Sequence, residues 1–399
     1  MLSISEKGKL MPASPIRKLV PFAEEAKLRG TKVYHLNIGQ PDIKTPECAL
    51  NAVKVADLKV IEYSHSAGFL SYRKKLAKYY QSVGIDINEN EIIVTNGGSE
   101  AILFAFMVCI NPGEEVIIPE PYYANYNGFA ITAGVVIKPI ASSIKNDFAL
   151  PAIEDFEKII TPKTKGIMLC NPNNPTGYLY SKEELEKVAI LVKKYNLYLF
   201  ADEVYREFCY DGEKHFSAMN LKGLEQNVVL LDGVSKRYSM CGVRIGVLIS
   251  HNCNVMRATM NFAQARLCPP SYGQIAAEAA IDTPKEYFTE VYNEYIERRN
   301  FMVAELNKMP GVYSPLPKGA FYTVASFPID NADKFCEWLL TSFSHKGQTV
   351  MMAPASGFYS HHSMGKNECR LAYVLNIDDL RNAMEVLAEA LKVYPGRTN

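Results

Sequence analysis

The chain has 399 residues, of which 48% are hydrophobic and 22% are charged, and both proportions are ordinary for soluble globular proteins. Its 43 lysines and arginines balance its 43 aspartates and glutamates, so no bulk electrostatic field favours nucleic acid or an anionic membrane as a partner. The length is enough for two or three domains.

Cysteine usage and the chain start predict a cytoplasmic protein. The nine cysteines are scattered without a CxxC pair, which indicates reduced thiols and neither a disulfide framework nor a metal site. Residues 1–19 lack the apolar core and cleavage site of a signal peptide. The most apolar helical run, residues 101–110, is too short to cross a bilayer, so we expect no membrane contact.

From about residue 90, short apolar runs alternate with helical patterns at residues 99–109 and 181–195. Continuous apolar strands separated by helices predict an α/β fold with a mainly parallel sheet covered on both faces. In such sheets ligands bind beyond the carboxyl ends of the strands. The predicted strands are residues 91–95, 115–119, 166–170, 197–201, 228–231 and 243–249.

The pattern changes at about residue 285. A long charged helix is predicted at residues 287–306, followed by strands at 319–324 and 369–373 and a last helix at 377–393. This part is predicted to be a smaller α+β domain.

The first polar motif is TNGGSEA, residues 95–101. A strand, two glycines (Gly97 and Gly98) and a serine (Ser99) that opens a helix can bind an anion through backbone N–H groups and the helix N-terminus. The alternative for this motif alone is a glycine turn with a serine N-cap.

Two further motifs follow predicted strands. NPNNPTG, residues 171–177, is a rigid loop that presents Asn174 in a fixed orientation, although a plain turn explains it equally well. FADEVYREF, residues 200–208, places Asp202 at the end of a buried strand, with Tyr205 three residues later. A carboxylate there is costly unless it meets a cation, or else it caps the next helix.

The last two motifs carry cations. GVSKRYSMCGVRIG, residues 233–246, contains Lys236 and Arg244, and NECRLAYV contains Arg370 at the start of a strand. Each alone could be an ordinary surface or ion-pair residue, and a lone arginine usually is.

Together the motifs require one ligand that has a phosphate, a protonatable ring nitrogen, a ring oxygen and an aldehyde. The glycine motif and Arg244 suit the phosphate, Asp202 the nitrogen, and Asn174 with Tyr205 the oxygen. The aldehyde would condense with Lys236. Pyridoxal 5′-phosphate has all four groups.

The sequence resembles the class I aminotransferases, the fold-type I pyridoxal-phosphate enzymes of the aspartate aminotransferase family. The motifs occur in the family's order and cover nearly the whole chain. They are GQPDIKTP (39–46), YSHSAGFLSYR (63–73), TNGGSEA, EPYYANY, NPNNPTG, DEVY, SK followed by GVRIG, and CRLAYV.

The resemblance implies a large domain with a seven-stranded sheet and a smaller domain built from both chain ends. We expect an N-terminal arm with part of the small domain at 1–45, a large cofactor-binding domain at 46–284 and a small C-terminal domain at 285–399. It also implies a homodimer with shared sites, in which the partner subunit contributes Tyr63 to the phosphate.

The resemblance also assigns roles to single residues. Lys236 forms the Schiff base and moves the proton, Asp202 pairs with the ring nitrogen, and Asn174 and Tyr205 hold the ring oxygen. Arg370 binds the substrate α-carboxylate, which its planar fork suits. The other implied contacts are ring stacking by Tyr123, phosphate binding by Gly97, Gly98, Ser99, Ser235 and Arg244, and substrate closure at Gly39.

The implied activity is a ping-pong transfer of an amino group from an L-amino acid, with aspartate and 2-oxoglutarate as the first hypothesis. Aspartate-specific relatives often carry a lysine at the position of Ser99, so we hypothesise that Arg266 binds the side-chain carboxylate instead. A structural ion pair is the alternative for Arg266. Gly233 replaces a serine that many relatives carry.

Other activities stay open. Tyr122, Tyr123, Tyr126, Phe321 and Tyr322 also suit an aromatic or broad-range aminotransferase. A carbon–sulfur β-lyase would use the same cofactor set, but we rank it lower. A regulatory protein with an aminotransferase-like domain normally needs a DNA-binding segment, and a plain nucleotide-binding protein would leave Lys236 and Asp202 without a role.

Overall fold

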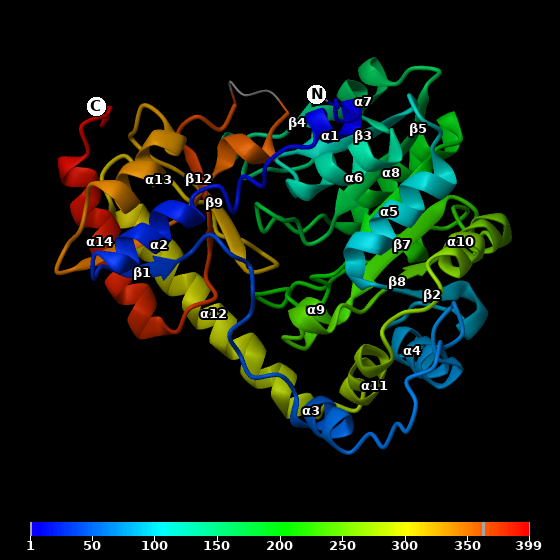
Figure 1. The fold of residues 1–399 in the computed structure, drawn as a ribbon. Helices are drawn as coiled ribbons and strands as arrows, with labels where there is room; N and C mark the ends of the chain where they lie inside the picture. The colour runs from blue at the N-terminus through cyan, green and yellow to red at the C-terminus, as the bar shows by residue number, and fades with distance from the viewer. Residues whose placement is uncertain (1, 361–363, 399) are drawn as a thin grey trace.

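A computed structural model describes residues 2–360 and 364–398. Its main sheet has seven strands: β2 (Ile92–Thr95), β3 (Glu115–Glu120), β4 (Val136–Ala141), β5 (Thr164–Cys170), β6 (Tyr198–Asp202), β7 (Val228–Gly233) and β8 (Gly246–Ile249). Their spatial order is β2-β8-β7-β6-β5-β3-β4, and only β8 runs antiparallel to its neighbours (Figure 1). The predicted mainly parallel sheet is confirmed.

Helices cover both faces of this sheet, because its central strands carry apolar side chains on both faces. Within β6, Leu199 and Ala201 pack into one core while Phe200 packs into the core on the opposite face. The Phe200 face is covered by α5 (Gly97–Cys109), α6 (Asn125–Ala133) and α10 (Cys253–Ala265). The other face is covered mainly by α4 (Leu70–Ser82), α7 (Ile153–Ile159), α8 (Lys182–Tyr195) and α11 (Ser271–Ala280), with α3 (Glu47–Lys54) against α11.

A further core combines the two ends of the chain, and we call this part the terminal lobe. Ala23 and Leu36 from the N-terminal part pack in one cluster with Phe335 and Leu387. Its elements are α2 (Val20–Leu28), β1 (Lys32–His35), α12 (Lys285–Lys308), β9 (Tyr322–Ser326), α13 (Ala332–Thr341), β10 (Gln348–Met351), β11 (Ala353–Pro354), β12 (Glu368–Ala372) and α14 (Ile377–Val393). Two small sheets, β1-β10 and β11-β12-β9, complete it.

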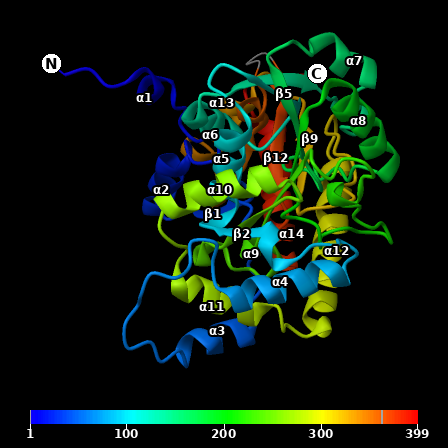
Figure 2. The ribbon, with the colours of Figure 1, turned by 90° about the vertical axis from the view of Figure 1, so that its right-hand side faces the viewer.

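The first residues extend away from these cores. The short helix α1 (Glu6–Leu10) lies on an arm that projects from the body of the molecule, as Figure 2 shows. None of the helices in the described part of the chain is long and apolar enough to span a membrane.

One predicted strand is shorter than expected. Residues 243–249 were predicted to be extended throughout, but β8 begins only at Gly246. A 3-10 turn, η4 (Cys241–Val243), precedes it, and Arg244 has a left-handed φ of 58°. This turn directs the Arg244 side chain toward the start of α5, as described below.

Candidate active site

Three loops meet at the carboxyl edge of the central sheet because β5, β6 and β7 are adjacent and parallel. Asp202 ends β6, and Asn174 lies in the loop after β5. Lys236 lies in the one-turn helix α9 (Val234–Arg237), which follows β7 directly. The topology therefore brings together side chains that are as many as 62 positions apart in the sequence.

Asp202 is buried and has no cationic partner at ion-pair distance among the described residues. Its Oδ2 accepts a 2.7 Å hydrogen bond from the Tyr126 hydroxyl. Burial raises the pKa of Asp202 to about 6. A buried carboxylate of this kind is stabilised by a cation, and the protonated ring nitrogen of pyridoxal phosphate fits that requirement.

Lys236 is partly buried, and its amine donates a 2.7 Å hydrogen bond to the carbonyl of Gly39. Desolvation is the main cause that lowers the pKa of this lysine. A side chain at position 39 would overlap Tyr322, since a Cβ there would lie 1.6 Å from the tyrosine hydroxyl. The glycine thus allows the backbone of the terminal lobe to reach the lysine.

A chain of hydrogen bonds links the ring-oxygen candidates to the carboxylate-binding candidate. The Asn174 amide donates to the Tyr205 hydroxyl at 3.4 Å, and that hydroxyl lies 2.9 Å from the hydroxyl of Tyr322. Arg370 Nη1 donates to Asn174 Oδ1 at 3.1 Å. These polar atoms are buried together where the loops of the central sheet meet the terminal lobe.

Arg370 is 1% exposed, and no carboxylate pairs with it among the described residues. Its guanidinium lies between the rings of Tyr322 and Phe358, at 4.7 and 4.9 Å from their centroids, and also donates to the carbonyl of Asn37. Its Nε has no hydrogen-bond partner. A buried guanidinium with free donor capacity fits a carboxylate ligand.

The start of α5 forms the proposed phosphate cradle. Gly97 has a φ of 76°, and a Cβ there would lie 2.4 Å from Arg244 Nη2. The N-cap, Asn96, makes no side-chain capping bond, which leaves the first N–H groups of the helix available. Arg244 donates to the Cys241 carbonyl at 3.0 Å and forms no ion pair with a described carboxylate. The cradle therefore suits an anion.

Other predicted contacts lie around these groups. Tyr123 packs edge-on against Tyr126 at 5.4 Å, and its pKa is raised mainly by burial and also by the charge of Asp202. Ser99 is in the first turn of α5, and Ser235 is the residue before Lys236; both are partly buried.

Two predicted residues lie outside this arrangement. Tyr63 is 77% exposed in the loop of residues 55–69. Arg266 pairs with Glu100 at 2.9 Å and donates to the carbonyls of Ser66 and Val94 at 3.1 and 3.2 Å. Its guanidinium is therefore engaged within the chain, which favours the structural ion pair over the substrate role.

The sequence prediction missed several contacts of the site. Tyr126 was expected near the site as an aromatic residue, but its hydrogen bond to Asp202 was not expected. Asn37 and Phe358 were missed because nothing in their local sequence signals a contact with Arg370. The thiol of Cys241, 3.8 Å from the Lys236 amine, was also missed.

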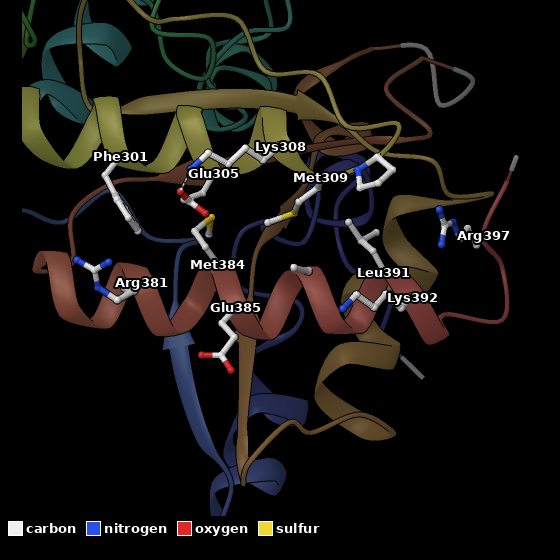
Figure 3. A pocket seen from close by; sticks show the side chains of 12 residues that line it. Phe301, Glu305, Lys308, Met309, Arg381, Met384, Glu385, Leu391, Lys392 and Arg397 are labelled. Atoms are coloured by element: carbon white, nitrogen blue, oxygen red, sulfur yellow. Dashed lines mark hydrogen bonds and ion pairs between the residues drawn. The ribbon is translucent and has the colours of Figure 1, made fainter.

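A cavity of about 430 Å³ lies elsewhere, on the terminal lobe. It is lined by Phe301 and Met309 of the α12 side and by Met384 and Leu391 of α14, and charged residues of both helices also line it (Figure 3). None of the site residues described above lines it.

Comparisons of family, sequence and structure all match this chain to aminotransferases. Residues 31–387 match the family model for aminotransferase class I and II. An aromatic-amino-acid aminotransferase of Thermococcus litoralis is 31% identical over 98% of this chain and 99% of its own, and an aspartate aminotransferase of Thermotoga maritima is 31% identical over 94% and 97%. The solved aspartate aminotransferase of Thermus thermophilus with maleate superposes with a TM-score of 0.89, at 28% identity, over 98% of this chain and all of that one.

Proposed function

The chain belongs to the class I and II aminotransferases, pyridoxal-phosphate enzymes, and we propose that it transfers the amino group of aspartate to 2-oxoglutarate. The observation that carries the chemistry is the meeting of the Lys236 amine, the buried Asp202 carboxylate and the buried Arg370 guanidinium at one edge of the sheet. The name of the substrate pair rests on relatives that are aspartate aminotransferases.

Lys236 is proposed to be the proton carrier. Bound pyridoxal phosphate supplies an aldehyde that reacts with amines and a ring that accepts electrons from the breaking bond. Lys236 would hold the cofactor through its Nζ, and its free amine would move the substrate Cα proton. Because burial lowers the pKa of this amine, a larger fraction is unprotonated and able to act as a base.

The surrounding residues set the geometry. Asp202, oriented by the Tyr126 hydroxyl, keeps the ring nitrogen protonated, while Asn174 and Tyr205 bind the ring oxygen. Gly97, Ser99 and Arg244 bind the phosphate. Arg370 binds the α-carboxylate, so that the Cα–H bond is held beside Lys236. One site processes both substrates in turn, and the kinetics are ping-pong.

A second candidate donor is an aromatic amino acid. Arg266 is already paired with Glu100, so its guanidinium is not free to bind the second carboxylate of aspartate within one chain. The rings of Tyr123, Tyr322 and Phe358 surround the Arg370 side of the site instead. A relative at 31% identity is named for aromatic amino acids.

The experiment is a comparison of kcat/KM for L-aspartate and L-phenylalanine, each with 2-oxoglutarate, in wild type and Arg266→Ala. If the ion pair is the role of Arg266, both donors lose turnover by similar factors. A loss of kcat/KM for aspartate alone would show that Arg266 binds the side-chain carboxylate of the substrate. Product analysis with cystathionine separates transfer, which gives glutamate, from β-elimination, which gives pyruvate and ammonia.

We also propose a homodimer. The loop that carries Tyr63 and the adjoining helices expose many large apolar side chains, and such patches are typical of protein interfaces. They include Leu50, Val53, Val55, Leu58, Val60, Ile61, Leu70, Leu267 and Tyr272. In the proposed dimer Tyr63 reaches the phosphate cradle of the partner subunit.

A further inference from the structure

A cluster of buried charges lies directly behind the site, and we call it the rear network. It consists of Arg206, Glu207, Asp232 and Arg237, with the hydroxyls of Tyr79 and Tyr80. Two cations balance two anions, and three of the four charged side chains are almost fully buried. No step of the proposed reaction uses these groups.

Asp232 is the centre of the rear network. Its Oδ2 accepts 2.7 Å hydrogen bonds from the Tyr80 hydroxyl and from Arg237 Nη2, and a third bond from Arg206 Nη2. Its Oδ1 accepts from the N–H of Gly233 at 2.6 Å. The carboxylate therefore joins α4, the turn after β6 and α9 in one set of contacts.

The second carboxylate of the rear network is Glu207. It lies 2.7 Å from Arg237 Nε and accepts a hydrogen bond from the Tyr79 hydroxyl. The Arg237 guanidinium also lies over the ring of Tyr79, at 4.5 Å from its centroid. Arg237 thus links both carboxylates and is fixed on two sides.

Members of the rear network are the chain neighbours of site residues. Arg206 follows Tyr205, and Arg237 follows Lys236. In each pair one side chain faces the cofactor site and the next faces the rear network. A displacement of either arginine would therefore move the adjacent site residue through the shared backbone.

We propose that the rear network, centred on Asp232 and Arg237, positions Lys236 and Tyr205 for the reaction from behind the active site. The inference rests on the proposed function of that site. The charge balance supports it, because a buried arginine or aspartate is held firmly when every charge has a partner and relaxes when one is removed. Asp232 also influences the site by its charge. Burial is the main cause that raises the pKa of Asp202, and the negative charge of Asp232 raises it further.

The test uses the cofactor-loaded protein and two readouts other than activity: the rate at which pyridoxal phosphate is released and the pKa of the visible absorbance band. In Asp232→Asn and Arg237→Gln we expect release to be about tenfold faster, because misplaced contacts hold the cofactor poorly. We expect the pKa of the band to move by about 0.5 units or more. Arg237→Lys, which retains the charge, should fall between these variants and wild type.

Arg299→Gln is the control, since Arg299 is another buried arginine that pairs with a carboxylate, the half-exposed Asp211 at 2.8 Å, outside the site. It should lower the melting temperature but leave both readouts near wild type. If Asp232→Asn and Arg237→Gln give readouts like this control, the rear network is only structural and the inference is overturned.

A third variant and a reference experiment complete the test. If Asp232→Asn and Arg237→Gln do not fold, Tyr80→Phe removes one hydrogen bond to Asp232 without changing charge, and it should speed release about threefold. Unchanged release in Tyr80→Phe would then overturn the inference. Borohydride trapping of the cofactor on Lys236 of wild type is the reference: if no cofactor is trapped there, the proposed function itself fails.

Discussion

At the residue scale, Asp202 shows a conflict between folding and function. A carboxyl group whose folded-state pKa is raised to about 6 destabilises the fold at neutral pH, because ionisation is easier in the unfolded chain. The same burial makes the group a strong partner for a ring cation. Asp202 thus destabilises the fold when the site is empty and stabilises the bound cofactor when the site is loaded.

This conflict predicts that Asp202→Asn makes the cofactor-free protein more stable at pH 8, by up to about 3 kcal/mol. The penalty from Asp202 is fully present above pH 6 and vanishes below its unfolded pKa near 4, so the gain should shrink as the pH falls from 6 to 4. Urea unfolding of both proteins without cofactor at pH 8 and pH 4.5 measures it. A gain that does not change with pH would contradict the assignment of the raised pKa.

Three of the site residues that the sequence predicted share one property: each stands at or after the carboxyl end of a predicted strand. Lys236, Asp202 and Asn174 could be placed at one sheet edge for that reason. Tyr126 and Tyr322 were expected near the site as aromatic residues, but their hydrogen bonds to Asp202 and Tyr205 were not, because these join residues 76 and 117 positions apart. Such contacts depend on how the terminal lobe and α6 pack, which local patterns do not encode.

At the scale of elements, the phosphate cradle depends on the close approach of α5 and β8. A Cβ at Gly246 would lie 2.4 Å from the carbonyl carbon of Gly97 and 2.6 Å from the nitrogen of Gly98. Both are backbone atoms, so a side chain there can be accommodated only if the helix moves away from the sheet.

We therefore expect Gly246→Ala to lower cofactor affinity at least about tenfold, because the first N–H groups of α5 move away from Arg244. Gly242→Ala is the matched control, since a Cβ there meets no atom within 4 Å. Equilibrium binding of pyridoxal phosphate to both variants measures the effect. Equal affinities in the two variants would show that the close approach does not matter for binding.

The elements also show where sequence patterns fail. The helix at residues 377–393 has its predicted bounds, because a strong amphipathic pattern coincides with an N-cap at Asn376. Strand β4 was missed because it is an edge strand with Pro139 in it and little buried surface. The short strands β1 and β10 were also missed, since each is four residues long and gains its partner from the other end of the chain.

At the scale of the whole molecule, the proposed dimer means that one chain alone would be incomplete as an active unit, because Tyr63 lies on an exposed loop. The proposed dimer would bury the apolar side chains of this loop and of α3, and would supply a tyrosine to each phosphate cradle. Neither the fold nor the cores require the loop to be apolar.

This arrangement predicts complementation between two inactive variants. Lys236→Ala lacks the amine, and Tyr63→Ala should lose most cofactor affinity in each of its sites. A mixed dimer has one site with both residues, so refolding an equal mixture should restore about a quarter of wild-type activity. Sedimentation confirms the dimer in each sample. A mixture that stays as inactive as its components would contradict shared sites.

The most direct measurement for the proposed function is a half-reaction on the loaded protein, without any 2-oxo acid. L-aspartate or L-phenylalanine is added, and both the visible absorbance and the released oxo acid are followed. An aminotransferase converts its cofactor to the pyridoxamine form and releases one oxo acid per site, while Lys236→Ala releases none. Pyruvate and ammonia from a sulfur amino acid, with no conversion by either donor, would contradict the account.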